Sequence, residues 1–401
     1  MQLCGRPARR SGPPCAGPDR GAGWRRGLAA CSLAAAGLLA ACSPAGRSPP
    51  PQPADPAANI YALTGANHLA AAVKGALARV YVPNLGSNDV YVIDPATQRV
   101  VDRYPVGLAP QHVVPAWDLK TLWVTSSAQG RLPGSLTAID PVTGKATRTV
   151  RVPDAYNMYF TPDGSAAIVV AEQLRRLEFR DPHTMKLEAV LKVAACAGLN
   201  HADFTPDGRF AIFTCEFNGT LAKIDIAQRK VLGYLKLRAG GMPQDVRSAP
   251  GGHVFYVANM MTDGVSLIDP DRFVEVGFIH TGTGAHGLYP SRDGTRLYVS
   301  NRGSHLINGL PHGPGGVSVI DFATNKVEHT WMIPGGGSPD MGNVSADGKV
   351  LWLSGRFDDV VYAIDTTSGV VHIIKVGHTP HGLAVWPQPG RYSLGHTGEM
   401  R

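Results

Sequence analysis

Residues 282–333, GTGAHGLYPSRDGTRLYVSNRGSHLINGLPHGPGGVSVIDFATNKVEHTWMI, contain one copy of the unit that repeats through most of this 401-residue chain. Short runs of β-branched and aromatic residues predict four antiparallel strands, the first at 286–289 and the last at 327–333. Residues 290–294 predict a hairpin turn between the first two strands, because Gly294 tolerates the positive φ angle that such a turn requires. The stretch therefore predicts a four-stranded meander with a long, glycine-rich loop after its second strand.

The Ile-Asp pair at the end of the predicted third strand recurs along the chain. Its aspartates are Asp94, Asp140, Asp225, Asp269, Asp321 and Asp365, and Arg180-Asp181 fills the one remaining slot. Consecutive aspartates are about 44 residues apart, a period in the range of β-propeller blades. One such sheet cannot bury both of its faces, whereas seven sheets arranged radially bury each face against a neighbour.

The two ends of the repeat region predict how the propeller closes. The region begins with a second strand, Arg79 to Val82, and ends with a lone first strand, His381 to Val385. The predicted fold class is therefore all-β: a seven-bladed β-propeller of four-stranded antiparallel blades at residues 59–401, closed by the C-terminal strand, which completes the first blade. The roles of the lead-in, 59–75, and of the tail, 391–401, stay open.

The first 41 residues have the features of an export signal. Arg25-Arg26 precede a small apolar run, 28–41, that is too short for a transmembrane helix. The end of this run, Leu-Ala-Ala-Cys42, resembles the lipobox of bacterial lipoproteins. That resemblance implies cleavage before Cys42, lipidation of its thiol, and a position at the outer face of the cytoplasmic membrane. Residues 42–58 are rich in proline and predict an extended tether, while the export route, Sec or twin-arginine, stays open.

The net charge of the chain depends on the export signal. The whole chain has a formal net charge of +7, but residues 1–41 hold six arginines and one aspartate, so the remainder holds 32 basic and 30 acidic residues. A nearly neutral domain gives no reason to expect a nucleic-acid partner. We expect a monomer whose partners are the membrane, through Cys42, and a small ligand or a protein at the mouth of the propeller channel.

Three second strands carry a family resemblance. Tyr81–Asn84, Tyr256–Asn259 and Tyr298–Asn301 have the sequences YVPN, YVAN and YVSN, and each is followed by a Val-x-x-Ile-Asp strand. These runs resemble the YVTN repeats of bacterial and archaeal β-propeller proteins. That family includes surface-layer proteins and relatives of the haem domain of dissimilatory nitrite reductase, so the resemblance implies a fold without naming a function. The haem domain has eight blades, and the seven expected here argue against haem as a cofactor.

Aligning the predicted first strands places one polar residue of each blade at the channel mouth. These residues are His112, Asn157, His201, Asp245, His286, Asp340 and His381. Their side chains should converge on one funnel, where the four histidines His112, His201, His286 and His381 suit a copper or zinc ion. The alternative is structural, since polar residues at these positions can hydrate a channel mouth or bond the backbone of the next blade.

The loops around the same mouth carry further charged and soft side chains. Equivalent positions hold Glu172, Glu216, Arg302 and Arg356. Ion pairs between loops are the default prediction for this set, and solvated charge is the alternative. The same pattern places six further side chains near the mouth: Met242, Met260, Met261, Met341, His305 and His312. Thioether and imidazole ligands suit copper, although packing explains each methionine by itself more simply.

Cys196 and Cys215 are the only cysteines after Cys42. One precedes the first strand of blade four and the other ends its second strand, so antiparallel pairing brings them together in an oxidising compartment. The sequence favours a disulfide, with free thiols or soft metal ligands beside His201 as the alternatives.

Two hypotheses for function follow from the sequence. The first is a membrane-tethered, extracytoplasmic binding module whose His/Asp-lined mouth takes a ligand, a metal or a protein partner. The second is an exported metal-dependent enzyme, a lyase, hydrolase or oxidase, that uses the same His/Asp ring. The sequence contains no recognisable nucleophile and base, so the identity of the ligand and the existence of a catalytic activity both stay open.

Overall fold

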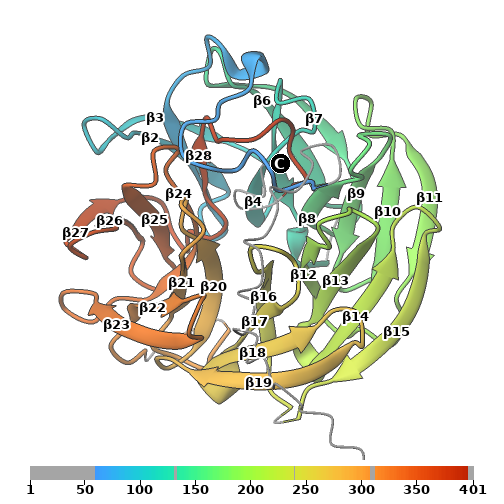
Figure 1. Cartoon of the computed structure of the whole chain (residues 1–401). Coiled ribbons are helices and arrows are strands. Elements are labelled where there is room, and N and C mark those ends of the chain that lie inside the picture. The colour runs from blue at the N-terminus through green and yellow to red at the C-terminus, as the bar shows by residue number, and fades with distance from the viewer. Residues whose placement is uncertain (1–58, 131–132, 239, 308–311, 396–401) are drawn as a thin grey trace, which may run out of the picture. The chain divides into compact units, whose positions relative to one another are not determined.

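Seven four-stranded antiparallel sheets are arranged around a central axis in the computed structural model (Figure 1). The structure describes residues 59–130, 133–238, 240–307 and 312–395. The predicted all-β fold, a seven-bladed β-propeller, is therefore confirmed. The predicted signal peptide, Cys42 and the tether lie outside the described residues.

Each blade begins with an inner strand next to the axis and ends with an outer strand at the rim. Blade one comprises β28 (Ala384–Trp386), β1 (Arg79–Asn84), β2 (Asp89–Asp94) and β3 (Arg99–Pro105). Blade two comprises β4 (Pro110–Pro115), β5 (Leu122–Ser126), β6 (Ser135–Asp140) and β7 (Lys145–Arg151). Blade three comprises β8 (Ala155–Phe160), β9 (Ala167–Ala171), β10 (Arg176–Arg180) and β11 (Leu187–Lys192). Blade four comprises β12 (Leu199–Phe204), β13 (Phe210–Cys215), β14 (Thr220–Asp225) and β15 (Lys230–Lys236).

The last three blades follow the same order. Blade five comprises β16 (Pro243–Ser248), β17 (Phe255–Asn259), β18 (Gly264–Asp269) and β19 (Val274–His280). Blade six comprises β20 (Ala285–Pro290), β21 (Arg296–Asn301), β22 (Gly316–Asp321) and β23 (Lys326–Met332). Blade seven comprises β24 (Pro339–Val344), β25 (Val350–Gly355), β26 (Val360–Asp365) and β27 (Val371–Lys375). The helical turns are η1 (Ala71–Val73), η2 (Ala128–Gly130), η3 (Glu216–Asn218) and η4 (Met260–Thr262), and no helix among the described residues could span a membrane.

The C-terminal strand closes the ring, as the sequence predicts. β28 pairs antiparallel with β1, with Ala384 opposite Tyr81 and Trp386 opposite Arg79. The His381 amide still bonds to the Pro83 carbonyl of blade one, over 3.1 Å, but the strand is regular only from Ala384 because the backbone of Gly382 bonds to blade two. There the Gly382 carbonyl accepts a hydrogen bond of 2.9 Å from the Val113 backbone amide.

The hydrophobic core lies between neighbouring blades. Every residue of the inner strands β4, β8, β12, β16 and β24 is buried. Between blades one and two, Tyr81, Val113 and Trp386 belong to one apolar cluster, and full burial of such a side chain contributes ~1.5–3 kcal/mol. The inner strands are thus held rigidly from both sides, which fixes the side chains that face the channel.

The segments before β1 and after β28 lie against the ends of the inner strands. Leu69 forms a backbone bridge with Gly390, so the two segments contact each other. The carbonyl of Leu394 accepts a hydrogen bond of 2.9 Å from the amide of Phe160, the last residue of β8. The lead-in and the described part of the tail, 391–395, therefore lie at one end of the channel.

Candidate functional site

The inner strands begin at one end of the channel, here called the mouth, and finish at the other, here called the far end. The first residue of each inner strand pairs with the last residue of the next strand of its blade, as Leu199 does with Cys215 and Ala285 with Asn301. Counted from this pair, His201 is the third residue of its strand but His286 is the second. The predicted equivalence of the seven ring positions is therefore wrong by one residue in three blades.

Two layers of side chains replace the single predicted ring. The upper layer, from the second positions, consists of Gln111, Tyr156, Asn200, Gln244, His286, Asp340 and His381. The lower layer, from the third positions, consists of His112, Asn157, His201, Asp245, Gly287, Met341 and Gly382. Successive side chains of a strand alternate in direction, and only upper-layer residues line the mouth cavity among these two sets. The predicted site residues are thus divided, with His286, Asp340 and His381 above and the other four below.

A cavity of about 320 Å³ lies at the mouth. Upper-layer residues line it together with Glu172, Glu216, Arg302 and Arg356, which directly follow the second strands of blades three, four, six and seven. All four charged side chains are buried, which contradicts the alternative of solvated charge. The cavity lies at the small end of the range for pockets that bind small molecules.

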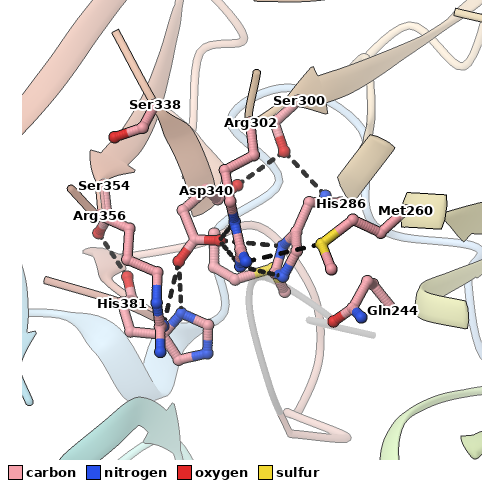
Figure 2. A network of polar contacts seen from close by, with 12 residues as sticks. Gln244, Met260, His286, Ser300, Arg302, Ser338, Asp340, Ser354, Arg356 and His381 are labelled. Carbon is pink, nitrogen blue, oxygen red and sulfur yellow. Dashed lines mark hydrogen bonds and ion pairs between the residues drawn. The ribbon is translucent and has the colours of Figure 1, made fainter. Parts of the chain in front are cut away.

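Asp340 is the centre of the polar network at the mouth (Figure 2). Its Oδ1 accepts a hydrogen bond of 3.0 Å from Arg302 Nε, and its Oδ2 accepts one of 2.6 Å from His381 Nδ1. His286 Nδ1 lies 3.1 Å from Oδ1, and Arg356 Nη1 lies 3.4 Å from Oδ2. One buried carboxylate is thus shared by two arginines and two histidines.

The charge states of this network follow from burial and from its neighbours. Burial acts to raise the pKa of Asp340, but Arg302 and the two histidines outweigh it and hold that pKa well below its ordinary value. Burial lowers the pKa of His381 to about 4, against the opposing effect of Asp340. Burial, together with Arg302, holds the pKa of His286 well below its ordinary value. At neutral pH the network therefore contains one carboxylate, two neutral imidazoles and two guanidinium groups.

The arrangement of Arg302 bears on the predicted metal site. Arg302 Nη2 donates to His286 Nε2, while His286 Nδ1 faces Asp340. A neutral imidazole binds a metal through a free nitrogen lone pair, and in His286 the guanidinium takes that lone pair. Across the described ranges, no group of three or more His, Cys, Asp or Glu side chains is arranged to hold a metal ion. Within the upper layer, His286 bonds to Arg302, and Asp340 bonds to Arg302 and Arg356.

Two charged side chains of the cavity have polar groups without partners. Arg356 is only 5% exposed, and its Nε has no hydrogen-bond partner in the part of the chain that the structure describes. The Glu172 carboxylate accepts no hydrogen bond from the described residues, and burial followed by the proximity of Glu216 raises its pKa well above the ordinary value. Glu216, by contrast, accepts hydrogen bonds of 2.7 Å from Asn200 and 3.0 Å from Gln244.

A model of the YNCE-like beta-propeller family matches residues 25–389. The chain belongs to this family. The resemblance to a β-propeller family that the Tyr-Val-x-Asn runs predict is thereby confirmed. No curated protein matches the sequence.

Solved structures share the fold with this YNCE-like propeller. Dihydro-heme d1 dehydrogenase NirN in complex with DHE is 16% identical, with a TM-score of 0.59 over 84% of this chain and 83% of that chain. Hydrazine synthase of Kuenenia stuttgartiensis is 20% identical, with a TM-score of 0.53 over 64% of this chain and 76% of that chain. A functionally unknown protein from Desulfotomaculum acetoxidans DSM 771 is 14% identical, with a TM-score of 0.61 over 77% of this chain and 98% of that chain. At such identities the likeness shows the fold alone, and function must come from the site.

The lower layer of the YNCE-like propeller contains the other predicted ring residues. The ring of His112 lies 5.2 Å from that of His201 and 4.8 Å from that of His381, measured between centroids. Burial holds the pKa values of His112 and His201 well below the ordinary value. Asp245 Oδ2 accepts a hydrogen bond of 2.9 Å from the Leu288 amide in the next blade. This last contact is the kind of inter-blade bond that the structural alternative predicts.

Of the predicted soft ligands, Met260 lies beside the network at the mouth, with its Sδ 3.6 Å from Arg302 Nη1, whereas the two loop histidines lie elsewhere. His305 Nε2 lies 2.7 Å from Asp263 and His312 Nε2 lies 3.1 Å from Asp358; neither histidine lines the mouth cavity. Among the methionines, Met341 Sδ lies 3.1 Å from His286 Nδ1. Each of these loop histidines therefore contacts an aspartate of another loop.

Cys196 and Cys215 form a disulfide, with their Cα atoms 4.8 Å apart. The bond links the loop before β12 to the last residue of β13. Glu216 follows Cys215 directly, so the disulfide fixes the backbone that carries one of the acidic groups of the mouth cavity.

Proposed function

We propose that this protein is a small-molecule binding module that holds an anionic ligand in its mouth cavity and is tethered at the outer face of the cytoplasmic membrane. The binding proposal rests on the surroundings of Arg356. Its guanidinium lines the cavity, is 5% exposed and has one N–H without a partner among the described residues. A buried polar group without a hydrogen bond is costly, and a ligand oxygen would supply the missing acceptor.

The charges on the cavity wall that contains Arg302 and Arg356 favour an anionic ligand. Arg302 and Arg356 share the single carboxylate of Asp340, while burial keeps His286 and His381 neutral at pH 7. One positive charge is therefore left without a counterion on this wall. Arginine binds carboxylates and phosphates with paired, charge-assisted hydrogen bonds, and a cavity of about 320 Å³ limits the ligand to a small molecule.

A binding measurement tests this proposal. Calorimetry with straight-chain mono- and dicarboxylates should detect saturable binding to the purified protein. Arg356→Gln should weaken that binding at least tenfold, since a hydrogen bond to a charged group contributes ~1.5–3 kcal/mol. The matched control is Arg296→Gln, which removes an exposed arginine whose Nε lies 2.7 Å from Glu328. Equal affinity of the parent and Arg356→Gln, or the absence of binding by any carboxylate, would overturn the proposal.

The tether is supported by the sequence before the propeller. An apolar run ends in the lipobox-like Leu-Ala-Ala-Cys42, and a proline-rich stretch follows it. Cys42→Ser should move the protein from the membrane fraction to the soluble fraction, because the lipid would be lost with the thiol. Retention of the variant in the membrane fraction would place the anchor elsewhere.

One contact favours a second candidate, an exported enzyme. His381 lines the cavity, and its Nδ1 donates to Asp340 over 2.6 Å. This contact fixes the tautomer and leaves Nε2 as the acceptor, which suits either a ligand to a metal or a proton acceptor. Elemental analysis of protein purified without added metal tests the metal-dependent form of this candidate. One equivalent of copper or zinc would support it, and metal-free protein that binds carboxylates would favour the binding module.

A further inference from the structure

The wall of the mouth cavity opposite the arginines also carries a buried ionisable group that lacks a hydrogen-bond partner among the described residues. Glu172 and Glu216 follow the second strands of blades three and four, whereas Arg302 and Arg356 follow those of blades six and seven, on the other side of the axis (Figure 1). Glu216 is held by two amide side chains. The Glu172 carboxylate, 8% exposed, accepts no hydrogen bond from the described residues.

An aromatic ring lies beside these carboxylates. Tyr156 lines the same cavity, is nearly buried, and lies close enough to Glu172 and Glu216 for both to act on its pKa, which burial first raises well above the ordinary value. The ring of Phe217 also lines the cavity. Carboxylates combined with the faces of aromatic rings are the surroundings that an organic ammonium group prefers.

We infer that the ligand of the mouth cavity is a small dipolar molecule of the amino-acid class, whose carboxylate binds Arg356 and whose ammonium group binds Glu172 beside Tyr156. This inference rests on the proposed function, because it concerns the same cavity and the same arginine. The Nε of Arg356, which has no partner among the described residues, and the carboxyl group of Glu172 then each acquire a partner from a single ligand. Arg356 also acts on both acidic side chains from across the cavity, so one small molecule can reach both walls.

An ammonium group fits the acidic wall better than a hydroxyl does. Glu172 and Glu216 are both buried, and Glu216 disfavours ionisation of Glu172, since like charges in a cavity repel. A bound cation relieves that repulsion, whereas a hydroxyl donates one hydrogen bond and leaves the repulsion in place. A ligand that carried only a carboxylate would leave this wall unsatisfied.

A chain-length series of ligands tests the inference on the unaltered protein. The series is the ω-amino acids from glycine to 6-aminohexanoate, each compared by calorimetry with the carboxylic acid that lacks the amine and with the amine that lacks the carboxylate. One or two members of the amino-acid series should bind at least tenfold more tightly than both of their single-charge counterparts. The optimal chain length then measures the separation of the two charged walls.

Two variants separate this inference from the proposed function. Glu172→Gln should weaken binding of the amino acid and abolish its preference over the matched carboxylic acid, which should bind at least as tightly as before because a nearby acidic group is removed, whereas Arg356→Gln should weaken both. Glu188→Gln, which alters an exposed carboxylate on the outer strand β11, is the matched control and should change neither affinity. Carboxylic acids that bind as tightly as their amino-acid partners would overturn the inference and leave the proposed function intact. Failure of both ligand classes to bind would overturn the proposed function as well.

Discussion

The two ends of the channel satisfy their charged groups in different ways. At the far end a second cavity, of about 280 Å³, is lined by lead-in residues together with Asp203. The hydroxyl of Tyr61, from the lead-in, donates to Asp203 Oδ1 over 2.6 Å, and Asp203 Oδ2 accepts a hydrogen bond of 2.8 Å from the Ser248 amide. At the mouth, Arg356 Nε and the Glu172 carboxylate have no such partners among the described residues. The chain thus supplies partners for the far-end carboxylate, whereas these two groups at the mouth have none among the described residues, and the proposed ligand site rests on this difference.

The largest loss of stability should come from deleting β28, the strand that closes the ring of blades. Ending the chain at Val376 deletes β28 and the tail, so that blade one loses its inner strand and exposes the unpaired edge of β1. Loss of Trp386 alone would cost ~3–5 kcal/mol, out of a total stability of about 5–15 kcal/mol for a typical domain. The truncated protein should be insoluble or should show no cooperative unfolding by circular dichroism. Soluble, monomeric protein with an unchanged melting temperature would contradict this.

Removal of the central carboxylate at the mouth should have the next largest effect. Asp340→Ala leaves Arg302 and Arg356 buried without a counterion, and breaking a buried ion pair by removing one partner costs ~3–5 kcal/mol. Urea unfolding should therefore show a loss of this size. The control, Asp271→Ala, alters an exposed aspartate in the turn before β19 and should change stability by less than about 0.5 kcal/mol. A similar loss in both variants would mean that the carboxylate is not central.

The fold was predictable from the sequence because each blade repeats the same buried strand ends. Ile93 and Ile320, more than two hundred residues apart, are both wholly buried at the same point of their blades, and repetition makes such a constraint visible. The site was less predictable. The sequence pattern predicts equivalent positions for His201 and His286, yet they occupy different layers. The pattern of polar residues does not show at which residue the pairing of each strand begins.

The sequence did place the charged residues of the two walls at the mouth. Glu172 and Arg356 immediately follow the last residues of β9 and β25, so a count from the strand ends places them at the mouth. Their burial was not predictable, since it depends on how the surrounding loops pack. The closure of the far end was also hidden, because contacts such as the Leu69–Gly390 bridge are made by the backbone, which any sequence could supply.

Titration of His381 at the mouth should make the stability of the protein depend on pH, with an effect of intermediate size. His381 has a pKa of about 4 in the folded protein and about 6.5 when unfolded, so between these values the unfolded chain binds a proton that the folded protein does not. Stability is then fully present above pH 6.5 and is lost as the pH falls to 4, by about 3 kcal/mol at 1.36 kcal/mol per pKa unit. Unfolding of the parent and of His381→Gln, measured from pH 4 to 7, isolates this contribution. The advantage of the parent should shrink with falling pH, and a constant difference would contradict the assignment.

The variant with the smallest expected loss of stability tests whether the far end and the mouth of the channel act independently. Tyr61→Phe removes the hydroxyl that donates to Asp203 and accepts a hydrogen bond of 3.1 Å from the Phe204 amide. The loss should lower stability by about 1–2 kcal/mol, while the affinity of the mouth for carboxylates stays unchanged, because Tyr61 belongs to the far-end cavity and not to the mouth cavity. Tyr234→Phe, on the outer strand β15 where the side chain is exposed, is the control and should alter neither property. If Tyr61→Phe weakens mouth binding in proportion to its loss of stability, the far end sets the geometry of the mouth, and the separation of closure from binding is wrong.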